Sequence, residues 1–224
     1  MLAQMALSYC FSCFSGIYLI GKAHHPMSKY FISFLIGLLF FTACTKPIDD
    51  VIENELFSPS NSGFILYTIK QGDHFTENNF YKPIEVSELK FLVKFDSSAI
   101  YQTNTEENQY DINKLYGFSD NNTHHHQYSA RFGWSWNDNS LRLYGYVYNE
   151  GKVDKTELGT VAIGTEISCS IKIADDQYIF SVNDVQIIIP RESTTSVAKG
   201  YLLYPYFGGD ETAPHDIRVW IKNL

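Results

Sequence analysis

Alternation of apolar and polar side chains, with a period of two residues, runs through most of the chain and limits the possible folds more than any other feature. It is clearest over residues 128–136, where Phe132 and Trp134 share one side of an extended segment. A period of two marks a strand with one buried face. Residues 137–140, Asn-Asp-Asn-Ser, tolerate the positive φ of a tight turn. The sequence therefore predicts a hairpin whose returning strand covers residues 141–148.

Shorter runs of the same alternation indicate a protein built of many strands. They predict strands over residues 64–69, 87–95, 116–119, 157–163, 166–173, 177–182, 185–189, 201–207 and 216–221. Residues 97–113 are polar and are expected to form a long loop. No segment that follows residue 44 has a clear helical period. Aromatic residues make up 16% of the chain and favour a pleated, half-buried surface. Closely spaced strands with turn signals between them are typical of an all-β sandwich or barrel.

The order of these segments narrows the fold. The hairpin rich in Trp and Tyr is followed by Ile171-x-Ile173, Tyr178-x-Phe180-x-Val182-Asn183 and Val185-x-Ile187, and a last strand follows a Gly-rich loop. From Gly63 onward this pattern resembles the concanavalin A-like jelly-roll domains of lectins, glucanases and laminin-G modules. The resemblance implies an all-β antiparallel β-sandwich over residues 64–224. By analogy of fold it also implies a glycan as the partner.

A short apolar segment that ends in a cysteine stands apart from the alternating region. Residues 27–29 carry one positive charge, residues 30–41 are mostly apolar, and two small residues precede Cys44. These are the parts of a secretory signal, and the apolar run is shorter than the roughly 20 residues of a membrane span. The segment resembles a bacterial lipoprotein signal peptide. The resemblance implies that residues 27–43 are removed and that Cys44 carries lipid, palmitate included, which would anchor the protein in the cell envelope, at the outer membrane of a Gram-negative bacterium.

The segments that flank this signal are expected to lie outside the folded domain. Residues 1–26 contain a second apolar stretch, for which the sequence favours an over-extended start, with translation beginning at Met27, over a membrane hairpin. Residues 44–63 are polar and contain proline and serine. Such a composition cannot bury enough apolar surface to fold, so this segment is expected to be a flexible tether.

The charge of the chain limits its partners. The chain has 17 basic and 25 acidic residues, and residues 1–43 contain two lysines and no acid, so 15 basic and 25 acidic residues, a net charge of −10, follow the signal. This acidity argues against nucleic acid as a partner and against electrostatic docking on anionic lipid, so the lipid would anchor the protein alone. Only Cys169 of the four cysteines lies in the predicted domain, as a small buried residue, so no disulfide forms there.

Aromatic side chains of the hairpin form the first candidate site. They are Trp134, Trp136, Tyr144, Tyr146 and Tyr148. Exposed aromatic rings can stack on sugar rings, because they offer both a flat face and a polar edge. Trp134 shares its side with Phe132, which favours a core position for the tryptophans. The tyrosines share their side with Arg142, and for them sugar binding and packing stay open.

Basic residues near the same hairpin could also take part in binding. Arg131 and Arg142 could pair with acidic sugars, although cross-strand salt bridges are the favoured interpretation. The run His124, His125 and His126 could bind a metal ion, but no acidic or cysteine partner lies at a diagnostic spacing. A solvated loop is the favoured interpretation of the histidines.

The most unusual stretch is residues 204–216, which places two glycines, two prolines and three acids between two strands. Asp210, Glu211 and Asp216 could offer oxygen ligands to Ca²⁺. His215 beside Asp216 could act as a base with an orienting carboxylate, and Glu211 could assist. The alternative is a structural loop, which the sequence favours.

Motifs of known enzymes are missing from the sequence. We find neither the Glu-x-Asp-x-x-Glu strand of glucanases nor the paired strands of alginate-lyase-like jelly rolls, and no Gly-x-Ser-x-Gly or His-Glu-x-x-His. The sequence therefore predicts a lipid-anchored envelope module that binds a polysaccharide or serves a structural role, and no cofactor unless Ca²⁺ binds. The alternatives are a carbohydrate-active hydrolase or lyase with a site around His215, and a partner of another envelope protein.

Overall fold

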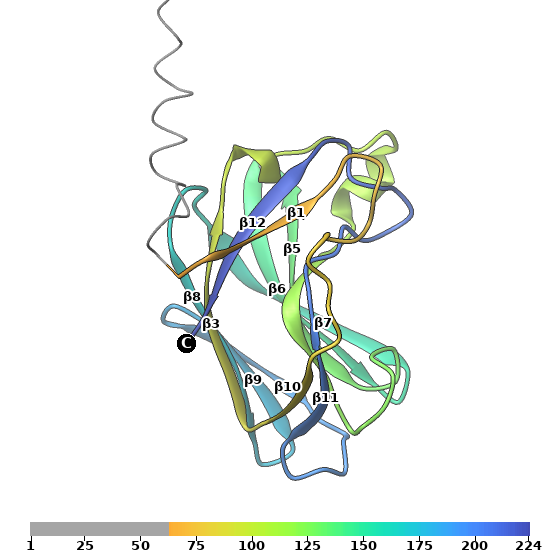
Figure 1. The fold of residues 1–224 in the computed structure, drawn as a ribbon, viewed down its shortest axis with the longest axis vertical. Helices are drawn as coiled ribbons and strands as arrows, with labels where there is room; N and C mark the ends of the chain where they lie inside the picture. Colours follow the sequence, from red (N-terminus) through yellow and green to blue (C-terminus); the bar gives the residue numbers. More distant parts are fainter. Residues whose placement is uncertain (1–62) are drawn as a thin grey trace, which may run out of the picture. The chain divides into compact units, whose positions relative to one another are not determined.

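Two antiparallel sheets, each of six strands, make up residues 63–224, which are the residues that the computed structural model describes (Figure 1). The first sheet has the order β1 (Ile65–Ile69), β12 (Ile217–Asn223), β3 (Glu88–Phe95), β8 (Ile167–Ala174), β9 (Gln177–Val182) and β10 (Val185–Pro190). The second has the order β2 (Pro83–Val86), β11 (Ala198–Leu203), β4 (Asn113–Ser119), β5 (Ser129–Asn137), β6 (Ser140–Asn149) and β7 (Lys152–Val161). Two short 3-10 turns, η1 (Ser97–Ala99) and η2 (Glu106–Tyr110), precede β4. The predicted all-β antiparallel sandwich of the jelly-roll type is confirmed.

The alternating pattern produces the core in the way the sequence predicts. On β5, Phe132 and Trp134 turn inward and are fully buried. The ring centroid of Phe132 lies 5.6 Å from that of Phe91 and 5.2 Å from that of Phe180, both in edge-to-face contact. Phe91 and Phe180 belong to the first sheet, so these aromatic contacts join the two sheets across the core. Cys169 is buried and unpaired, as expected.

Tight turns between the strands use the residues that the sequence singled out. Asp138 and Asn139 both have positive φ, 49° and 55°, in the two-residue turn between β5 and β6. Asp175 and Asp176 do the same between β8 and β9. A pair of residues with positive φ matches the right-handed twist of the flanking strands, and Asp and Asn tolerate it better than most residues.

Some strand limits differ from the prediction. β7 begins at Lys152, before the predicted residue 157. Its first six residues are exposed and, apart from Val153, polar, so they show no alternation. β11 lies at Ala198–Leu203, before the predicted 201–207, and the chain leaves the sheet near Pro205, which has no backbone N–H to donate. β2 was not predicted, and β4 starts earlier than residue 116.

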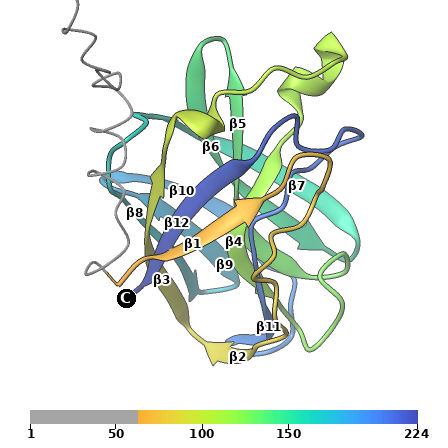
Figure 2. The same cartoon turned by 45° about the horizontal axis from the view of Figure 1, so that its top comes forward.

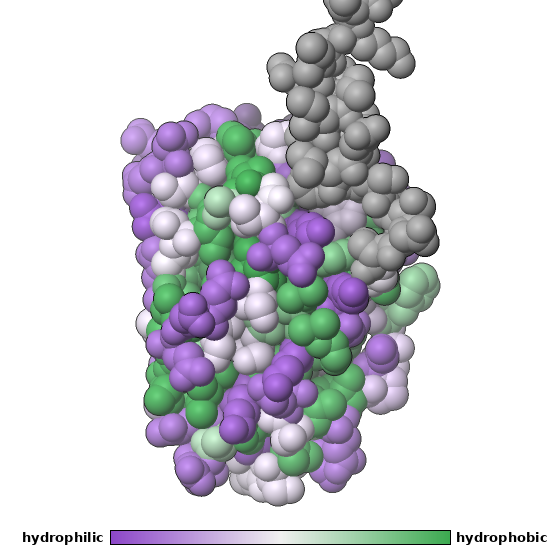
Figure 3. Space-filling view, turned by 90° about the vertical axis from the view of Figure 1, so that its left-hand side faces the viewer, coloured by the Kyte–Doolittle hydropathy of each residue, from purple (hydrophilic) through white to green (hydrophobic). Residues whose placement is uncertain are grey.

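The two ends of the described chain lie together. Ile65 pairs with Ile221, so β1 begins beside the C-terminal end of β12 (Figure 2). On the side of β3 and β8, hydrophilic and hydrophobic residues are interspersed on the visible surface (Figure 3). Within residues 63–224, no helix is long and apolar enough to cross a membrane. The predicted over-extended start, the signal peptide, the lipid site Cys44 and the tether up to residue 62 lie outside the described residues.

Candidate functional site

A pocket with a volume of about 530 Å³ is hollowed into the outer face of the second sheet. Its lining comes from β4, β5, β6 and β11 and from the segments that follow β1, β4 and β11. The most informative lining residues are Tyr81, Lys114, His124, His125, His126, Arg131, Tyr146, Tyr148, Tyr201, Tyr204 and Tyr206. A volume in this range is usual for small-molecule sites, which measure about 300–1,000 Å³.

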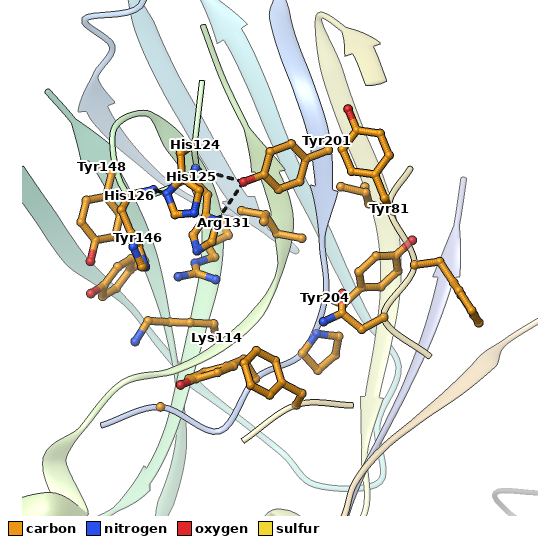
Figure 4. Close-up of a pocket in the computed structure, with 18 of the residues that line it drawn as sticks. Tyr81, Lys114, His124, His125, His126, Arg131, Tyr146, Tyr148, Tyr201 and Tyr204 are labelled. Carbon is orange, nitrogen blue, oxygen red and sulfur yellow. Dashed lines mark hydrogen bonds between the residues drawn. The ribbon is translucent and has the colours of Figure 1, made fainter. Parts of the chain in front are cut away.

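Arg131 forms the floor of the pocket. It lies on β5 between Ala130 and Phe132, and because those two face the core, Arg131 faces outward into the pocket (Figure 4). It is nevertheless only 7% exposed, since the surrounding segments enclose it. Gly117 on β4 pairs with Arg131, and a side chain at that glycine would overlap the backbone of β5. The glycine is therefore needed for β4 to lie against β5 at this point.

The Arg131 guanidinium has no acidic partner within residues 63–224. Its Nε has no hydrogen-bond partner, and its Cζ lies 5.8 Å from the ring centroid of Tyr146, the cross-strand neighbour on β6. Burial lowers the pKa of Arg131 to about 10, which still leaves the group charged at neutral pH. Buried charges in proteins are nearly always paired, so an unpaired buried arginine makes this pocket the candidate functional site.

Lys114 provides a second positive charge through an irregularity in β4. Lys114 pairs with Gly133 and Gly117 with Arg131, so β4 contains one extra residue at this point. This bulge lets Leu115 and Tyr116 both turn into the core while Lys114 keeps the outer face. The Lys114 ammonium donates to the carbonyl of Ile112 and lies 4.3 Å from the ring centroid of Tyr146. Burial and the nearby Arg131 lower the pKa of Lys114 to about 8.

The three histidines form one wall of the pocket. His125 is half-buried, and its Nδ1 lies 2.9 Å from the hydroxyl oxygen of Tyr201. Burial, with Arg131 next in importance, lowers the pKa of His125 to about 4, and burial also lowers the pKa of His126. His124 and His126 are exposed, as the favoured prediction of a solvated loop expects, but all three histidines line the pocket and His125 is half-buried.

The arrangement of the same three histidines could also bind a metal ion. The nitrogen atoms of all three lie within 4.8 Å of one another, and no other group of His, Cys, Asp and Glu comes together in this way in the described part of the chain. The low pKa of His125 keeps that imidazole neutral, as a ligand must be. Arg131 and Lys114 oppose a cation here, because both repel the charge of the histidines.

Tyrosines surround the charged floor. Tyr146 and Tyr148 lie on the side of the histidines, Tyr201 points its hydroxyl toward His125, and Tyr204 and Tyr81 lie on the far side (Figure 4). The pocket lining contains six tyrosines and two phenylalanines, and it contains no Asp or Glu. Tyr81 is 77% exposed and stands at the rim, with its ring centroid 5.5 Å from that of Tyr201. The result is a positively charged, aromatic pocket in a protein that is acidic as a whole.

The structure separates the predicted aromatic residues. Tyr146 and Tyr148 line the pocket, whereas Tyr144 lines a shallower neighbouring hollow and its hydroxyl oxygen lies 3.0 Å from that of Ser135. Trp134 is fully buried in the core and cannot stack on a ligand, and Trp136 packs partly buried against the same core. The favoured core position of the tryptophans is thus the one observed.

The two arginines of the hairpin also differ. Arg142 lies 2.9 Å from Glu157 across the strands and 3.4 Å from Asp138, so the salt-bridge interpretation is correct for Arg142. The same interpretation is wrong for Arg131, because β5 places it in the centre of the sheet, away from the acidic residues of the edge strand β7.

The stretch 204–216 divides into two parts. Its beginning supplies Tyr204, Pro205, Tyr206, Gly208 and Gly209 to the pocket. The acids that follow are not in that lining. The sequence therefore pointed to the tyrosine face and to this stretch as separate candidates, and the structure joins parts of both in one pocket.

The predicted catalytic and calcium residues of that stretch are held apart. Glu211 accepts hydrogen bonds from the backbone of Asn104 and Thr105, which together with side-chain amides lower its pKa to about 2. Asp216 binds Lys70, and Asp210 is exposed. Nε2 of His215 lies 2.9 Å from the carbonyl oxygen of Ser98. These contacts connect one loop to another, as the favoured interpretation of a structural loop expects. They bring together neither the ligands of a Ca²⁺ site nor a histidine with a carboxylate.

Comparison with known proteins gives a likeness of fold. No protein-family model matches the chain, and no curated protein matches it. Among solved structures, alginate lyase AlyC3 has a TM-score of 0.49 and 13% identity, covering 72% of this chain and 74% of that one. Alginate lyase vAL-1 from Chlorella virus has a TM-score of 0.45 and 10% identity over 71% and 82%. A glycoside hydrolase family 16 endo-glucanase from Bacteroides ovatus has a TM-score of 0.44 and 10% identity over 72% and 80%.

Proposed function

We propose that the protein is a glycan-binding module and that the glycan binds in the tyrosine-lined pocket. The observation that carries this proposal is the convergence of six tyrosines from distant parts of the chain on one open pocket. A tyrosine ring offers an apolar face to the C–H groups of a sugar and a hydroxyl to its polar edge. Phe80 and Tyr81 extend this surface beyond the pocket, since both are largely exposed at its rim. Large exposed aromatic residues of this kind mark binding surfaces.

An enzyme centred on His215 receives no support from the geometry. The His215 ring is hydrogen-bonded to the backbone carbonyl of Ser98, and it does not line the pocket. To test for an enzyme as well, the binding experiment should also measure whether the glycan is cleaved or modified. Shortened or modified glycan in the mixture would contradict a purely binding role.

Replacing Tyr146 by alanine is expected to weaken glycan binding by several-fold to about tenfold, because one aromatic stacking surface is lost. Isothermal titration calorimetry of the purified full-length protein against an oligosaccharide panel would measure the affinity. Tyr144→Ala is the matched control, since Tyr144 is two residues away on the same face of β6 but outside the pocket. Equal losses in both variants would show that the pocket is not the binding site.

We also propose that lipid on Cys44 holds this module at the cell envelope, in the outer membrane of a Gram-negative bacterium. The similarity of residues 27–44 to a lipoprotein signal peptide supports this location. An anchored position would bring the pocket to polysaccharides outside the cytoplasm. The acidic surface would add no attraction to anionic lipid, so the attachment depends on the acyl chains.

Replacing Cys44 by serine is expected to abolish labelling with radioactive palmitate and to move the protein from the membrane fraction to the soluble fraction. The reason is that the acyl chains need the cysteine thiol and the free amino group that processing creates. Cys169→Ala is the control, because Cys169 is buried in β8 and should not affect the label. Label that persists in the Cys44→Ser protein would rule out lipidation at this residue.

A further inference from the structure

We propose that the pocket selects a glycan that carries carboxylates, as uronic acids do, and that Arg131 binds a sugar carboxylate. This inference rests on the proposed glycan-binding function and adds the chemical class of the ligand. A pocket for a neutral glycan would not require a charged floor. The floor of this pocket is the nearly buried guanidinium of Arg131.

The strongest support is a comparison of the four arginines of the chain, all of which are described. Arg142 pairs with Glu157, Arg191 with Asp120 and Arg218 with Asp96, at 2.7–2.9 Å. Arg131 pairs with no carboxylate among residues 63–224, although it is one of the two most buried arginines. The protein thus provides an acidic partner for each arginine except the one that faces the pocket.

An unpaired buried charge is costly to the folded state. A guanidinium that is 7% exposed has lost most of its hydration, and its Nε makes no hydrogen bond within the described chain. An apolar residue at this place in the sheet would avoid that penalty. A ligand that supplies a carboxylate would compensate the charge, because the planar guanidinium presents two parallel N–H donors that fit the two carboxylate oxygens.

The surroundings of Arg131 fit an anion as well. The lining contains no Asp or Glu, whereas the chain as a whole has 25 acids and 17 basic residues. Lys114 adds a second cation from the neighbouring strand β4. A positive pocket in an otherwise acidic surface concentrates the attraction for an anionic sugar at this one place.

The first experiment compares acidic oligosaccharides with neutral counterparts of the same chain. The acidic series are oligomers of galacturonate, mannuronate, guluronate and glucuronate and sialylated glycans, and the counterparts are their methyl-esterified or carboxyl-reduced forms. We expect the full-length protein to bind at least one acidic series and to bind its neutral form about tenfold or more weakly. Arg131→Met should remove most of the difference in affinity between the acidic and the neutral forms, leaving only the share that Lys114 contributes. Arg142→Met, outside the pocket, should leave it unchanged.

The outcomes separate the inference from the proposed function. Equal binding of acidic and neutral forms would overturn the carboxylate site but leave glycan binding in place. A further series of sulfated glycans that lack carboxylates serves as a control, and binding to that series alone would also overturn the inference. Absence of binding to every glycan would contradict the proposed function itself. Thermal unfolding of Arg131→Met guards against a folding defect, and Arg131→Lys provides a second variant that keeps the charge but loses the paired donors, so it should bind more weakly than wild type.

The pH dependence gives an independent readout. The pKa of Lys114 is about 8 and that of Arg131 about 10, so between pH 7 and pH 9 Lys114 loses its charge while Arg131 keeps it. Asp111 and Lys155 also act on Lys114, and burial raises the pKa of its neighbour Tyr146 to about 12, which keeps that phenol neutral. Affinity for the acidic glycan should therefore be nearly full at pH 7 and fall between pH 7 and pH 9. Lys114→Met should bind more weakly and remove this fall, and an unchanged pH profile in that variant would contradict a role for Lys114.

Discussion

Replacing Arg191 by leucine is expected to lower the free energy of unfolding by about 3–5 kcal/mol, because it leaves a carboxylate buried without its counterion. Asp120 is fully buried, and its Oδ2 accepts hydrogen bonds from Nε of Arg191 at 2.8 Å and from the hydroxyl of Tyr178 at 2.7 Å. Chemical denaturation would measure the loss. In a thermal scan, a chain of this size should unfold roughly 6–20 °C earlier.

This group of three side chains connects the two sheets. Asp120 follows β4 of the second sheet, whereas Tyr178 lies on β9 and Arg191 follows β10, both of the first sheet. Asp120 also accepts a hydrogen bond from the backbone N–H of Lys199 on β11. The loss of Arg191 would therefore weaken the contact between the layers as well as the pair itself.

Two further variants test whether burial sets the size of the effect. Arg142→Leu breaks a pair at the surface, where water screens the charges, and should have a much smaller effect than Arg191→Leu. Asp120→Asn combined with Arg191→Leu should be more stable than Arg191→Leu alone, since it removes the unpaired charge. If Arg191→Leu and Arg142→Leu lower stability equally, the buried pair does not have the structural role assigned to it.

The same pair also supports the candidate site. Asp120 lies four residues before His124, and its carboxylate accepts a hydrogen bond from the backbone N–H of Asn121. Thr123 in turn donates its backbone N–H to the carbonyl of Asp120. The segment with the three histidines therefore starts from a fixed point, and a protein without Arg191 should lose glycan affinity along with stability.

Much of the fold was predictable because the signal for it is local. Phe132 and Trp134 alternate with outward-facing residues within a single strand, and two residues such as Asp138 and Asn139 are enough to specify a turn. The first part of β7 was missed because its six residues are all exposed and nearly all polar, so they show no alternation. These local units predicted a sandwich or a barrel, and the resemblance to concanavalin A-like domains implied the jelly-roll arrangement.

The site was harder to predict because it depends on contacts between distant residues. Tyr146 and the stretch from residue 204 were each singled out, but nothing in the sequence shows that they share a pocket. Lys114 was missed, since a bulge in β4 decides which way it faces. The lack of a partner for Arg131 is equally invisible, because it depends on where every acid of the chain lies after folding.

Replacing Gly117 by alanine adds only one methyl group, but it is expected to lower the free energy of unfolding strongly and to disrupt the binding pocket. The added Cβ would overlap the carbonyl oxygen of Ala130 and the Cα of Arg131, which are backbone atoms that cannot rotate away. β4 and β5 would have to separate at the point where Arg131 and Lys114 meet. We expect a loss of about 3 kcal/mol or more, at the upper end of the cost of overpacking.

A second glycine shows whether this loss comes from the close approach of the strands. Gly164 has a φ of +82° and free space around its position, so Gly164→Ala should cost only the roughly 1–2 kcal/mol of a left-handed backbone. It lies outside the pocket and should keep glycan affinity. Denaturation and calorimetry on both variants would measure the two effects. Should Gly117→Ala be as stable as Gly164→Ala and bind glycan normally, the tight packing of β4 against β5 would not be what positions Arg131.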